Sequence, residues 1–304
     1  MTDVLIIGAG PAGLAAAIYV QRAGKKALLL EEYSYGGQII NTPEIENYPG
    51  IAKISGFDFA TNLYQQAINL GAELVFEKAV EIEDKNDKKI VKGSQGNLYE
   101  AKAVIIATGA KKRHLGINKE EELIGRGISY CATCDGAFFK GKDVAVNGGG
   151  NTALSDALFL SDYCNKVYLI HRRDEFRGEA GNLEALRKKD NVEFILNSSV
   201  SSLLGEEKLE GLELTYKLTG EKRQIKVSGL FVAIGQEPAN EDFKNVTDLD
   251  KAGYIFAGED MRTKTAGIFT AGDCRTKEVR QLTTAASDGA VAALMACEYC
   301  NKNA

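Results

Sequence analysis

The chain is poor in proline and histidine, and it has no long apolar run. Four prolines stand against thirty-two glycines in 304 residues, a balance typical of an α/β protein with many tight strand–helix turns. No run reaches the roughly 18 apolar residues that cross a bilayer, and no export signal precedes the first strand. The net charge of −5 argues against binding to nucleic acid or an anionic membrane surface. We therefore expect a cytoplasmic protein.

The chain has six cysteines, which we do not expect to form a structural disulfide framework. Without an export signal, cysteines are more often redox-active or buried than structural. Cys164 and Cys274 are expected to be small buried hydrophobes. Cys297 and Cys300 share a face of the expected last helix, which could make a disulfide or half of a metal site. Since no second Cys/His cluster completes a zinc site, we expect an incidental, partly packed pair and no metal.

A first glycine fingerprint lies near the N-terminus. The apolar run 4–7 predicts a buried strand, which leads through Gly8-Ala9-Gly10-Pro11-Ala12-Gly13 into an alanine-rich helix. Such glycines permit the tight turn, the approach of a pyrophosphate and close helix–strand packing, while the helix N-terminus offers free amides. Glu31 ends the next apolar run, where a carboxylate can bind an adenosine ribose. This predicts a dinucleotide site; the alternative is a chance cluster of turn glycines.

A second fingerprint, Gly148-Gly149-Gly150-Asn151-Thr152-Ala153, follows the strand-like segment 143–147 and precedes a helix predicted over 154–163. The next apolar run leads into His171-Arg172-Arg173-Asp174-Glu175-Phe176-Arg177 instead of an acid. Guanidinium groups fork onto phosphate oxygens, so arginines at this position favour the 2′-phosphate of NADPH. The sequence predicts an NADPH site here; the alternative is a solvated basic turn.

Between the two fingerprints lies Cys131-Ala132-Thr133-Cys134-Asp135-Gly136. A dithiol stores two electrons as a disulfide, and two nucleotides could deliver them. The order predicts an electron relay from one nucleotide to a second and then to the sulfurs. Asp135 is the natural proton donor or acceptor for the thiolate that is left behind. The alternative is that Asp135 caps the start of a helix.

Other apolar strands end in a small residue and glycine, as in Thr108-Gly109 and Ala271-Gly272-Asp273. An acid such as Asp273, at a strand end beside a flavin, could hold the ribityl hydroxyls. Taken singly, each segment also fits an ordinary buried strand.

Together these blocks resemble the low-molecular-weight thioredoxin reductases, within the two-nucleotide disulfide oxidoreductase flavoproteins. The resemblance covers nearly the whole chain, and its most specific block is the Cys-x-x-Cys inside the pyridine-nucleotide half. It implies FAD as the first nucleotide and NADPH as the second. The residues that the motifs place at FAD are Gly8, Gly10, Pro11, Ala12, Gly13, Glu31, Gly37, Gln38, Asn47, Thr108, Gly109, Asp273, Arg280 and Gln281. Those placed at NADPH are Gly148, Gly150, Asn151, Thr152, Ala153, His171, Arg172, Arg173 and Arg177.

The resemblance also implies the direction of electron flow and the partners. Electrons would pass from NADPH through FAD to the Cys131–Cys134 disulfide. Cys134 would face the flavin, and Cys131 would attack the disulfide of thioredoxin or a thioredoxin-like protein through a mixed disulfide. A homodimer is expected on the same ground.

Two departures from the family pattern leave alternatives open. Asn147 puts a polar group at a strand end that is usually apolar, and Ser155-Asp156 stand where two acids are common. One alternative is a ferredoxin-fed or NADPH-independent flavoprotein dithiol/disulfide oxidoreductase. Separately from these departures, a flavin-binding module without enzymatic activity, whose cysteines are inert, is a further alternative.

The expected fold is α/β, with two Rossmann-like dinucleotide-binding domains, one inserted in the other. The FAD-binding domain is discontinuous, 1–112 and 240–304, and the inserted NADPH-binding domain, 113–239, carries the Cys-x-x-Cys. Strand–helix alternation predicts a parallel sheet in each. Segments 73–103 and 192–228 alternate apolar and polar residues and are expected to form antiparallel β-insertions.

Overall fold

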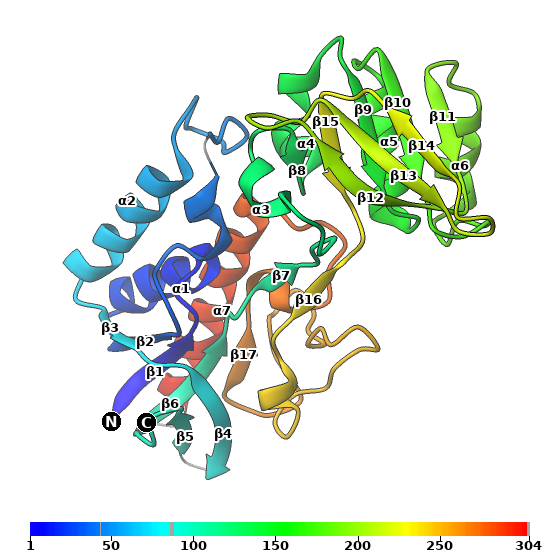
Figure 1. The fold of residues 1–304 in the computed structure, drawn as a ribbon. Helices are drawn as coiled ribbons and strands as arrows, with labels where there is room; N and C mark the ends of the chain where they lie inside the picture. Colours follow the sequence, from blue (N-terminus) through cyan, green and yellow to red (C-terminus); the bar gives the residue numbers. More distant parts are fainter. Residues whose placement is uncertain (43, 86–87, 303–304) are drawn as a thin grey trace. The chain divides into compact units, whose positions relative to one another are not determined.

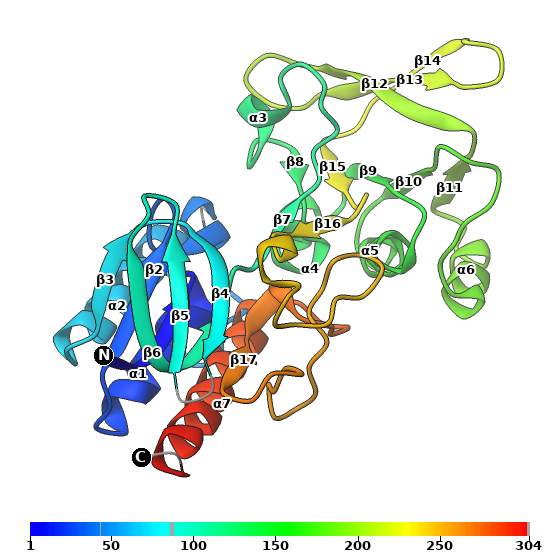
Figure 2. The same ribbon diagram turned by 90° about the horizontal axis from the view of Figure 1, so that it is seen from below.

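The computed structural model describes residues 1–42, 44–85 and 88–302 (Figures 1 and 2). The chain divides into two compact units, Met1–Lys111 with Glu237–Ala304 (unit 1) and Lys112–Gln236 (unit 2). The two connections are the short strands β7 (Ala110–Lys112) and β16 (Gln236–Pro238), which pair with each other. Both joints fall within these strands, slightly before the positions expected from the sequence.

Unit 1 is built on a seven-stranded sheet of order β3-β2-β1-β6-β5-β4, with β17 also pairing with β6. The strands β1, β2, β3, β6 and β17 run parallel, whereas β4, β5 and the first half of β6 form an antiparallel meander. The central strand β1 is nearly continuous in apolar residues, as expected for a parallel strand buried on both faces. The strand bounds are β1 Thr2–Ile7, β2 Ala27–Glu31, β3 Glu73–Phe76, β4 Ala79–Lys85, β5 Lys88–Gly93, β6 Leu98–Ile106 and β17 Ile268–Thr270.

Three helices cover this sheet: α1 (Pro11–Arg22), α2 (Gly56–Asn69) and α7 (Leu282–Lys302). Figure 1 shows α1 and α7 side by side, and small residues allow that approach. A Cβ on Gly289 would lie 2.1 Å from the Ala12 carbonyl oxygen. Among the described residues, neither α7 nor any other helix has the length and apolar character of a membrane span. Short 3₁₀ turns complete the unit: η1 (Gly37–Asn41), η3 (Glu241–Phe243) and η4 (Gly272–Cys274).

Unit 2 contains a five-stranded parallel sheet, β11-β10-β9-β15-β8, and a three-stranded antiparallel sheet, β12-β13-β14. The parallel strands are β8 Ile128–Ser129, β9 Asp143–Asn147, β10 Lys166–Ile170, β11 Val192–Ile195 and β15 Gly229–Val232. The antiparallel strands are β12 Ser198–Leu204, β13 Gly211–Tyr216 and β14 Lys222–Ile225. The helices are α3 Glu120–Leu123, α4 Ala132–Asp135, η2 Gly136–Phe139, α5 Asn151–Ser161 and α6 Ala180–Arg187.

These observations confirm the predicted fold class of two Rossmann-like folds with antiparallel insertions. Two details were wrong. The strands β3 and β11, which open the segments predicted as antiparallel, pair in parallel with β2 and β10. Each follows a helix, and a helical crossover returns the chain parallel to the strand before it. The helix predicted over 154–163 starts at Asn151, directly after the last fingerprint glycine.

Candidate functional site

In unit 1, the predicted flavin residues follow the carboxyl ends of adjacent parallel strands. The chain leaves β1 at Gly8, β6 at Ala107 and β17 at Ala271, and these three strands are neighbours. Because ligands of parallel α/β sheets bind beyond the carboxyl ends of the strands, this edge is the candidate site. The tertiary structure thus gathers the first fingerprint, Thr108-Gly109 and Asp273.

The first fingerprint has the backbone geometry that its glycines suggest. Gly8 has φ +103°, and a Cβ on it would lie 2.4 Å from the Ala107 carbonyl oxygen. A Cβ on Gly13 would lie 1.9 Å from the Gly8 carbonyl oxygen. Gly10 is the N-cap of α1, and no side chain caps this described helix. Its first amides are therefore available to an anion such as a pyrophosphate.

Glu31 is fixed beside this turn. Its Oε2 accepts a hydrogen bond from the Ala9 amide at 2.8 Å, and its Oε1 accepts one from the Tyr33 amide at 3.0 Å. A carboxylate has about four acceptor positions, so both oxygens can also accept from ribose hydroxyls.

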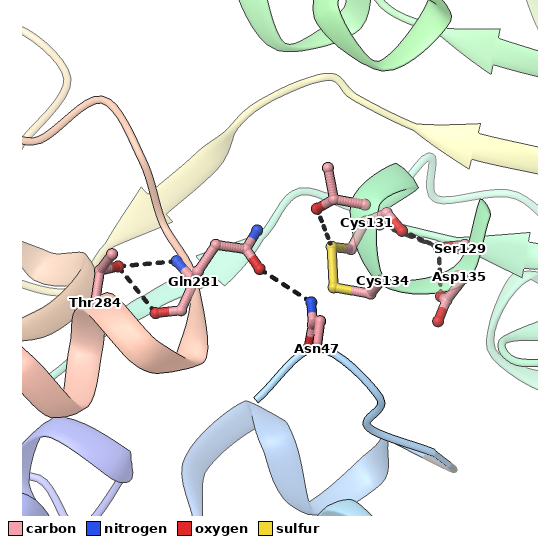
Figure 3. Close-up of a disulfide and its surroundings, with 8 residues drawn as sticks. Asn47, Ser129, Cys131, Cys134, Asp135, Gln281 and Thr284 are labelled. Atoms are coloured by element: carbon pink, nitrogen blue, oxygen red, sulfur yellow. Dashed lines mark hydrogen bonds between the residues drawn. A yellow bond between two sulfur atoms is a disulfide. The ribbon is translucent and has the colours of Figure 1, made fainter. Parts of the chain in front are cut away.

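Three further predicted flavin residues, Gln38, Asn47 and Gln281, form hydrogen bonds between loops of unit 1. Gln38 donates to the Ala110 carbonyl oxygen, and Asn47 Nδ2 donates to Gln281 Oε1 at 3.3 Å (Figure 3). At the start of α7, the Gln281 amide donates to Thr284 Oγ1, and this hydroxyl donates to the Gln281 carbonyl oxygen. These bonds hold three loops that are far apart in the sequence.

Gly37 and Arg280 complete the predicted flavin set. A Cβ on Gly37 would lie 3.2 Å from the Gly10 Cα atom, so this loop lies directly against the fingerprint. The Arg280 guanidinium stacks on the Tyr254 ring at 4.2 Å and donates to the Asp273 carbonyl oxygen at 3.4 Å.

Asn240 is a residue of this edge that no sequence motif contains. It is fully buried, accepts a hydrogen bond from Thr108 Oγ1 at 2.9 Å, and donates to the carbonyl oxygens of Gly253 and Cys274 at 2.8 Å each. It therefore ties the end of β6 to the turn that carries Asp273. A lone asparagine near an expected domain joint offers no sequence signal for this role.

A buried ionic cluster supports the same turn. The Asp288 carboxylate on α7 accepts from the Gly272 amide, from the Arg275 guanidinium and from Lys277 Nζ. Burial alone would raise the pKa of Asp288, but hydrogen bonds from Arg275 and Lys277 outweigh it and hold that pKa below its ordinary value.

In unit 2, the same edge rule brings the cysteines and the second fingerprint together. Ser129 ends β8, Asn147 ends β9 and Ile170 ends β10, all in one parallel sheet. The Cys-x-x-Cys, the glycines and the arginine loop therefore leave the sheet at one edge.

The Cys131–Cys134 pair forms a disulfide, with Cα atoms 5.3 Å apart (Figure 3). Cys131 is the extended N-cap of the one-turn helix α4, and its carbonyl oxygen accepts from the Asp135 amide at 3.1 Å. Thr133 Oγ1 lies 3.4 Å from Cys131 Sγ. Cys134 is exposed in unit 2 and Cys131 is partly buried.

Asp135 lies at the end of α4, not at its start. Its side chain caps neither α4 nor the following turn, so the capping alternative is wrong. Instead its Oδ2 accepts a hydrogen bond from Ser129 Oγ at 2.6 Å (Figure 3). Sequence reasoning missed Ser129, although its place two residues before the first cysteine was a visible hint.

In the second fingerprint, Gly148 and Gly149 lie against neighbouring atoms, whereas the space beside Gly150 is open. A Cβ on Gly148 would lie 2.3 Å from the Ala233 carbonyl oxygen, and one on Gly149 would lie 2.2 Å from the His171 ring. Around Gly150, in contrast, no described atom lies within 4 Å of an added Cβ. A phosphate could approach there, at the N-terminus of α5. Ala153, in the first turn of this helix, is buried in the core of unit 2.

The arginine loop folds back onto this fingerprint. The Arg177 amide donates to the Gly149 carbonyl oxygen at 2.7 Å, and the Glu179 amide donates to Asn151 Oδ1 at 2.8 Å. The side chains of Arg172, Arg173 and Arg177 are exposed, as is Thr152. Residues over twenty positions apart thus form one surface.

His171 supports the loop from inside. It is 4% exposed and stacks on Phe176 with ring centroids 5.2 Å apart. Burial, together with the arginines nearby, lowers the pKa of His171 and so favours the neutral ring. The placement favours a packing role beneath Gly149 over direct contact with a nucleotide.

Asp156 on α5 is a largely buried carboxyl, and burial raises its pKa from 3.8 to about 7 against the opposing charge of Lys112. Between about pH 4 and pH 7 the unfolded chain loses this proton while the folded chain keeps it, so the free energy of unfolding falls as pH rises. We expect Asp156→Asn to raise that free energy by about 2 kcal/mol near pH 8 and to leave it unchanged near pH 4. Urea unfolding at both pH values checks this. An equal gain at both pH values would contradict it.

The other four cysteines are buried and free, including both Cys297 and Cys300. Burial raises the pKa of Cys297, and it raises that of Cys300 to about 11. In the described part of the chain, no group of three or more candidate metal ligands occurs. The burial predicted for Cys164 and Cys274 is confirmed, and the pair on α7 is more deeply packed than expected.

Comparisons with known proteins agree with this geometry. The family model of pyridine nucleotide-disulphide oxidoreductases matches residues 2–289. A Clostridium pasteurianum protein described as a 34.2 kDa protein in the rubredoxin operon is 44% identical, over 98% of this chain and 96% of its own. The thioredoxin reductase of Listeria monocytogenes is 43% identical, over 98% of this chain and 93% of its own. The crystal structure of thioredoxin reductase from Streptococcus pyogenes superposes with a TM-score of 0.94 at 39% identity, over 99% of both chains. The chain therefore belongs to the pyridine nucleotide-disulphide oxidoreductase family, in its low-molecular-weight thioredoxin reductase group.

Proposed function

We propose that this protein is an NADPH-dependent thioredoxin reductase that uses FAD. The observation that carries the proposal is the Cys131–Cys134 disulfide, which lies at the same sheet edge as the second nucleotide fingerprint. The thioredoxin reductases among its relatives support the substrate class.

The edge of unit 1 fits FAD. The uncapped N-terminus of α1 suits a pyrophosphate, Glu31 suits the adenosine ribose, and Asp273 suits the ribityl hydroxyls. The close contacts around Gly8 and Gly13 keep the turn in this shape. When bound, the flavin would supply the redox chemistry that links a two-electron hydride donor to the reduction of a disulfide.

The edge of unit 2 fits NADPH. The open space at Gly150 suits the pyrophosphate, and the exposed arginines of the loop suit a 2′-phosphate. Because the loop is bonded to Gly149 and Asn151, its arginines have a defined position relative to that pyrophosphate.

In this proposal the chain's own residues handle the sulfur chemistry. Cys134 receives electrons from the flavin side, and Cys131 attacks the disulfide of thioredoxin or a thioredoxin-like protein. Asp135 moves the proton of the thiol that becomes a thiolate. We further propose a homodimer in the cytoplasm.

Anaerobic titration tests the proposal. The purified yellow protein is mixed with NADPH or NADH while the flavin absorbance is followed, and reduction of thioredoxin is then measured. We expect bleaching by NADPH at concentrations at least about tenfold below those needed with NADH, since a 2′-phosphate contact contributes about 1.5–3 kcal/mol. A flavin that stays oxidised with NADPH, yet reduces the disulfide after chemical reduction, would instead support the ferredoxin-fed alternative.

A further inference from the structure

Ser129 links both ends of the turn that carries the disulfide. It ends β8, pairs with Phe231 of β15, and is 4% exposed, so the sheet fixes its position. Its Oγ accepts a hydrogen bond from the Cys131 amide at 3.0 Å, where the turn begins. The same Oγ donates to Asp135 Oδ2 at 2.6 Å, where the turn ends (Figure 3).

The hydroxyl of Ser129 has one hydrogen and two nearby acceptors. Asp135 Oδ2 lies at 2.6 Å and the Cys131 carbonyl oxygen at 3.3 Å, and one hydrogen serves one of them at a time. An ionised carboxylate takes it in a short, charge-assisted bond. Ser129 therefore links the backbone of Cys131 to the Asp135 carboxylate.

Opening the disulfide increases the importance of this link. Reduction breaks the S–S bond and adds two electrons and two protons, so that each sulfur becomes a thiol; the electrons come from reduced flavin or from a dithiol reagent. The covalent closure of the turn is then gone. The hydrogen bonds that still close the turn include those from the amides of Cys134 and Asp135 to the Cys131 carbonyl oxygen, at 3.3 and 3.1 Å, and the two bonds of Ser129.

We propose that Ser129 is a positioning residue that holds the Asp135 carboxylate beside the cysteine pair and keeps the turn closed in the dithiol state. The inference rests on the proposed acid–base role of Asp135. The described hydrogen bonds of Ser129 reach the backbone of Cys131 and the carboxylate of Asp135, so it acts on the thiols by placing these two groups.

The test combines Ser129→Ala, Asp135→Asn and the double variant in the full-length flavoprotein. After reduction with a dithiol reagent, alkylation by iodoacetamide is followed across pH. The four other cysteines are buried, so the label reports the Cys131–Cys134 pair. A nearby carboxylate disfavours a thiolate, and we expect Asp135→Asn to move the alkylation midpoint about one pH unit lower and Ser129→Ala about half a unit lower.

The double variant separates positioning from simple structural support. We expect it to match Asp135→Asn alone in the alkylation midpoint, because without the Asp135 carboxylate Ser129 has no charge to hold beside the thiols. Ser129→Ala by itself should slow disulfide reduction about tenfold, a part of the 10²–10⁴-fold typical of a general acid or base. Ser129→Thr, which keeps the hydroxyl, should restore the rate to within about twofold of the wild type.

An unchanged alkylation profile in Ser129→Ala, or fully additive shifts of the alkylation midpoint in the double variant, would overturn the inference. If the added methyl of threonine prevents folding at this buried position, the alkylation midpoints of Ser129→Ala, Asp135→Asn and the double variant test the inference without it. Because alkylation needs neither NADPH nor thioredoxin, failure of the proposed reductase activity would leave this result readable.

Discussion

Cys131→Ser and Cys134→Ser should each abolish disulfide reduction while the flavin remains reducible. Serine cannot form the S–S bond that the structure shows between these positions, and electron transfer to a substrate disulfide requires a thiolate. We expect a loss of at least about 10³-fold, as for removal of a covalent catalyst. Stopped-flow measurement of flavin reduction, paired with a steady-state thioredoxin assay, checks both halves.

The matched control is the second Cys-x-x-Cys, on α7. Cys297→Ala and Cys300→Ala remove buried thiols of the same spacing, so they should lower stability slightly and retain activity. Loss of activity in these controls together with retention in Cys131→Ser would contradict the assignment of the redox pair. Failure of the wild type to reduce thioredoxin, with flavin binding unchanged in every cysteine variant, would favour the flavin-binding module with inert cysteines.

Removing the exposed arginines at the second fingerprint should change the preference between nucleotides. In Arg172→Ala/Arg173→Ala the 2′-phosphate loses two charged partners, each contributing about 1.5–3 kcal/mol. We therefore expect NADPH binding to weaken about 10²–10⁴-fold while NADH binding stays within about threefold. Equilibrium binding of 2′,5′-ADP and of 5′-AMP by calorimetry measures the phosphate contribution apart from turnover.

An arginine outside the loop provides the control for net charge. Arg223 on β14 pairs with Glu193 at 2.7 Å in the same unit, and Arg223→Ala should leave both nucleotides bound as in the wild type. A similar weakening in Arg223→Ala would show a general charge effect. An unaltered preference in the double arginine variant would leave the loop as the solvated basic turn of the alternative hypothesis.

Features of the fold and site that are formed by residues close together in the sequence can be predicted from the sequence. The two fingerprints were recognisable because their glycines, strand and helix are adjacent in the sequence, and the fold class followed from their alternation. The disulfide was predictable because Cys131 and Cys134 lie on one short turn. The alternating pattern does not encode the parallel pairing of β3 and β11, because pairing direction depends on the crossover that brings each strand back to the sheet.

Other parts of the site could not be predicted, because their partners are distant in the chain. Asn240 bonds across 132 residues to Thr108, and Glu179 bonds across 28 residues to Asn151. His171 was predicted to contact the nucleotide, but the fold buries it beneath Gly149. No local pattern encodes such contacts.

The sequence by itself determined the chemistry available to this protein: two glycine turns suited to phosphates, a dithiol with an adjacent acid, and arginines after the second site's strand. Backbone freedom and side-chain type are properties of single residues, so the sequence alone states them. The tertiary structure decided which groups act together. Only the alignment of parallel strand ends brought the cysteines and the second fingerprint to one edge of unit 2. Only the burial of Ser129 against the sheet directed its hydroxyl to Asp135, because hydrogen-bond partners are set by distance in space and not by position along the chain.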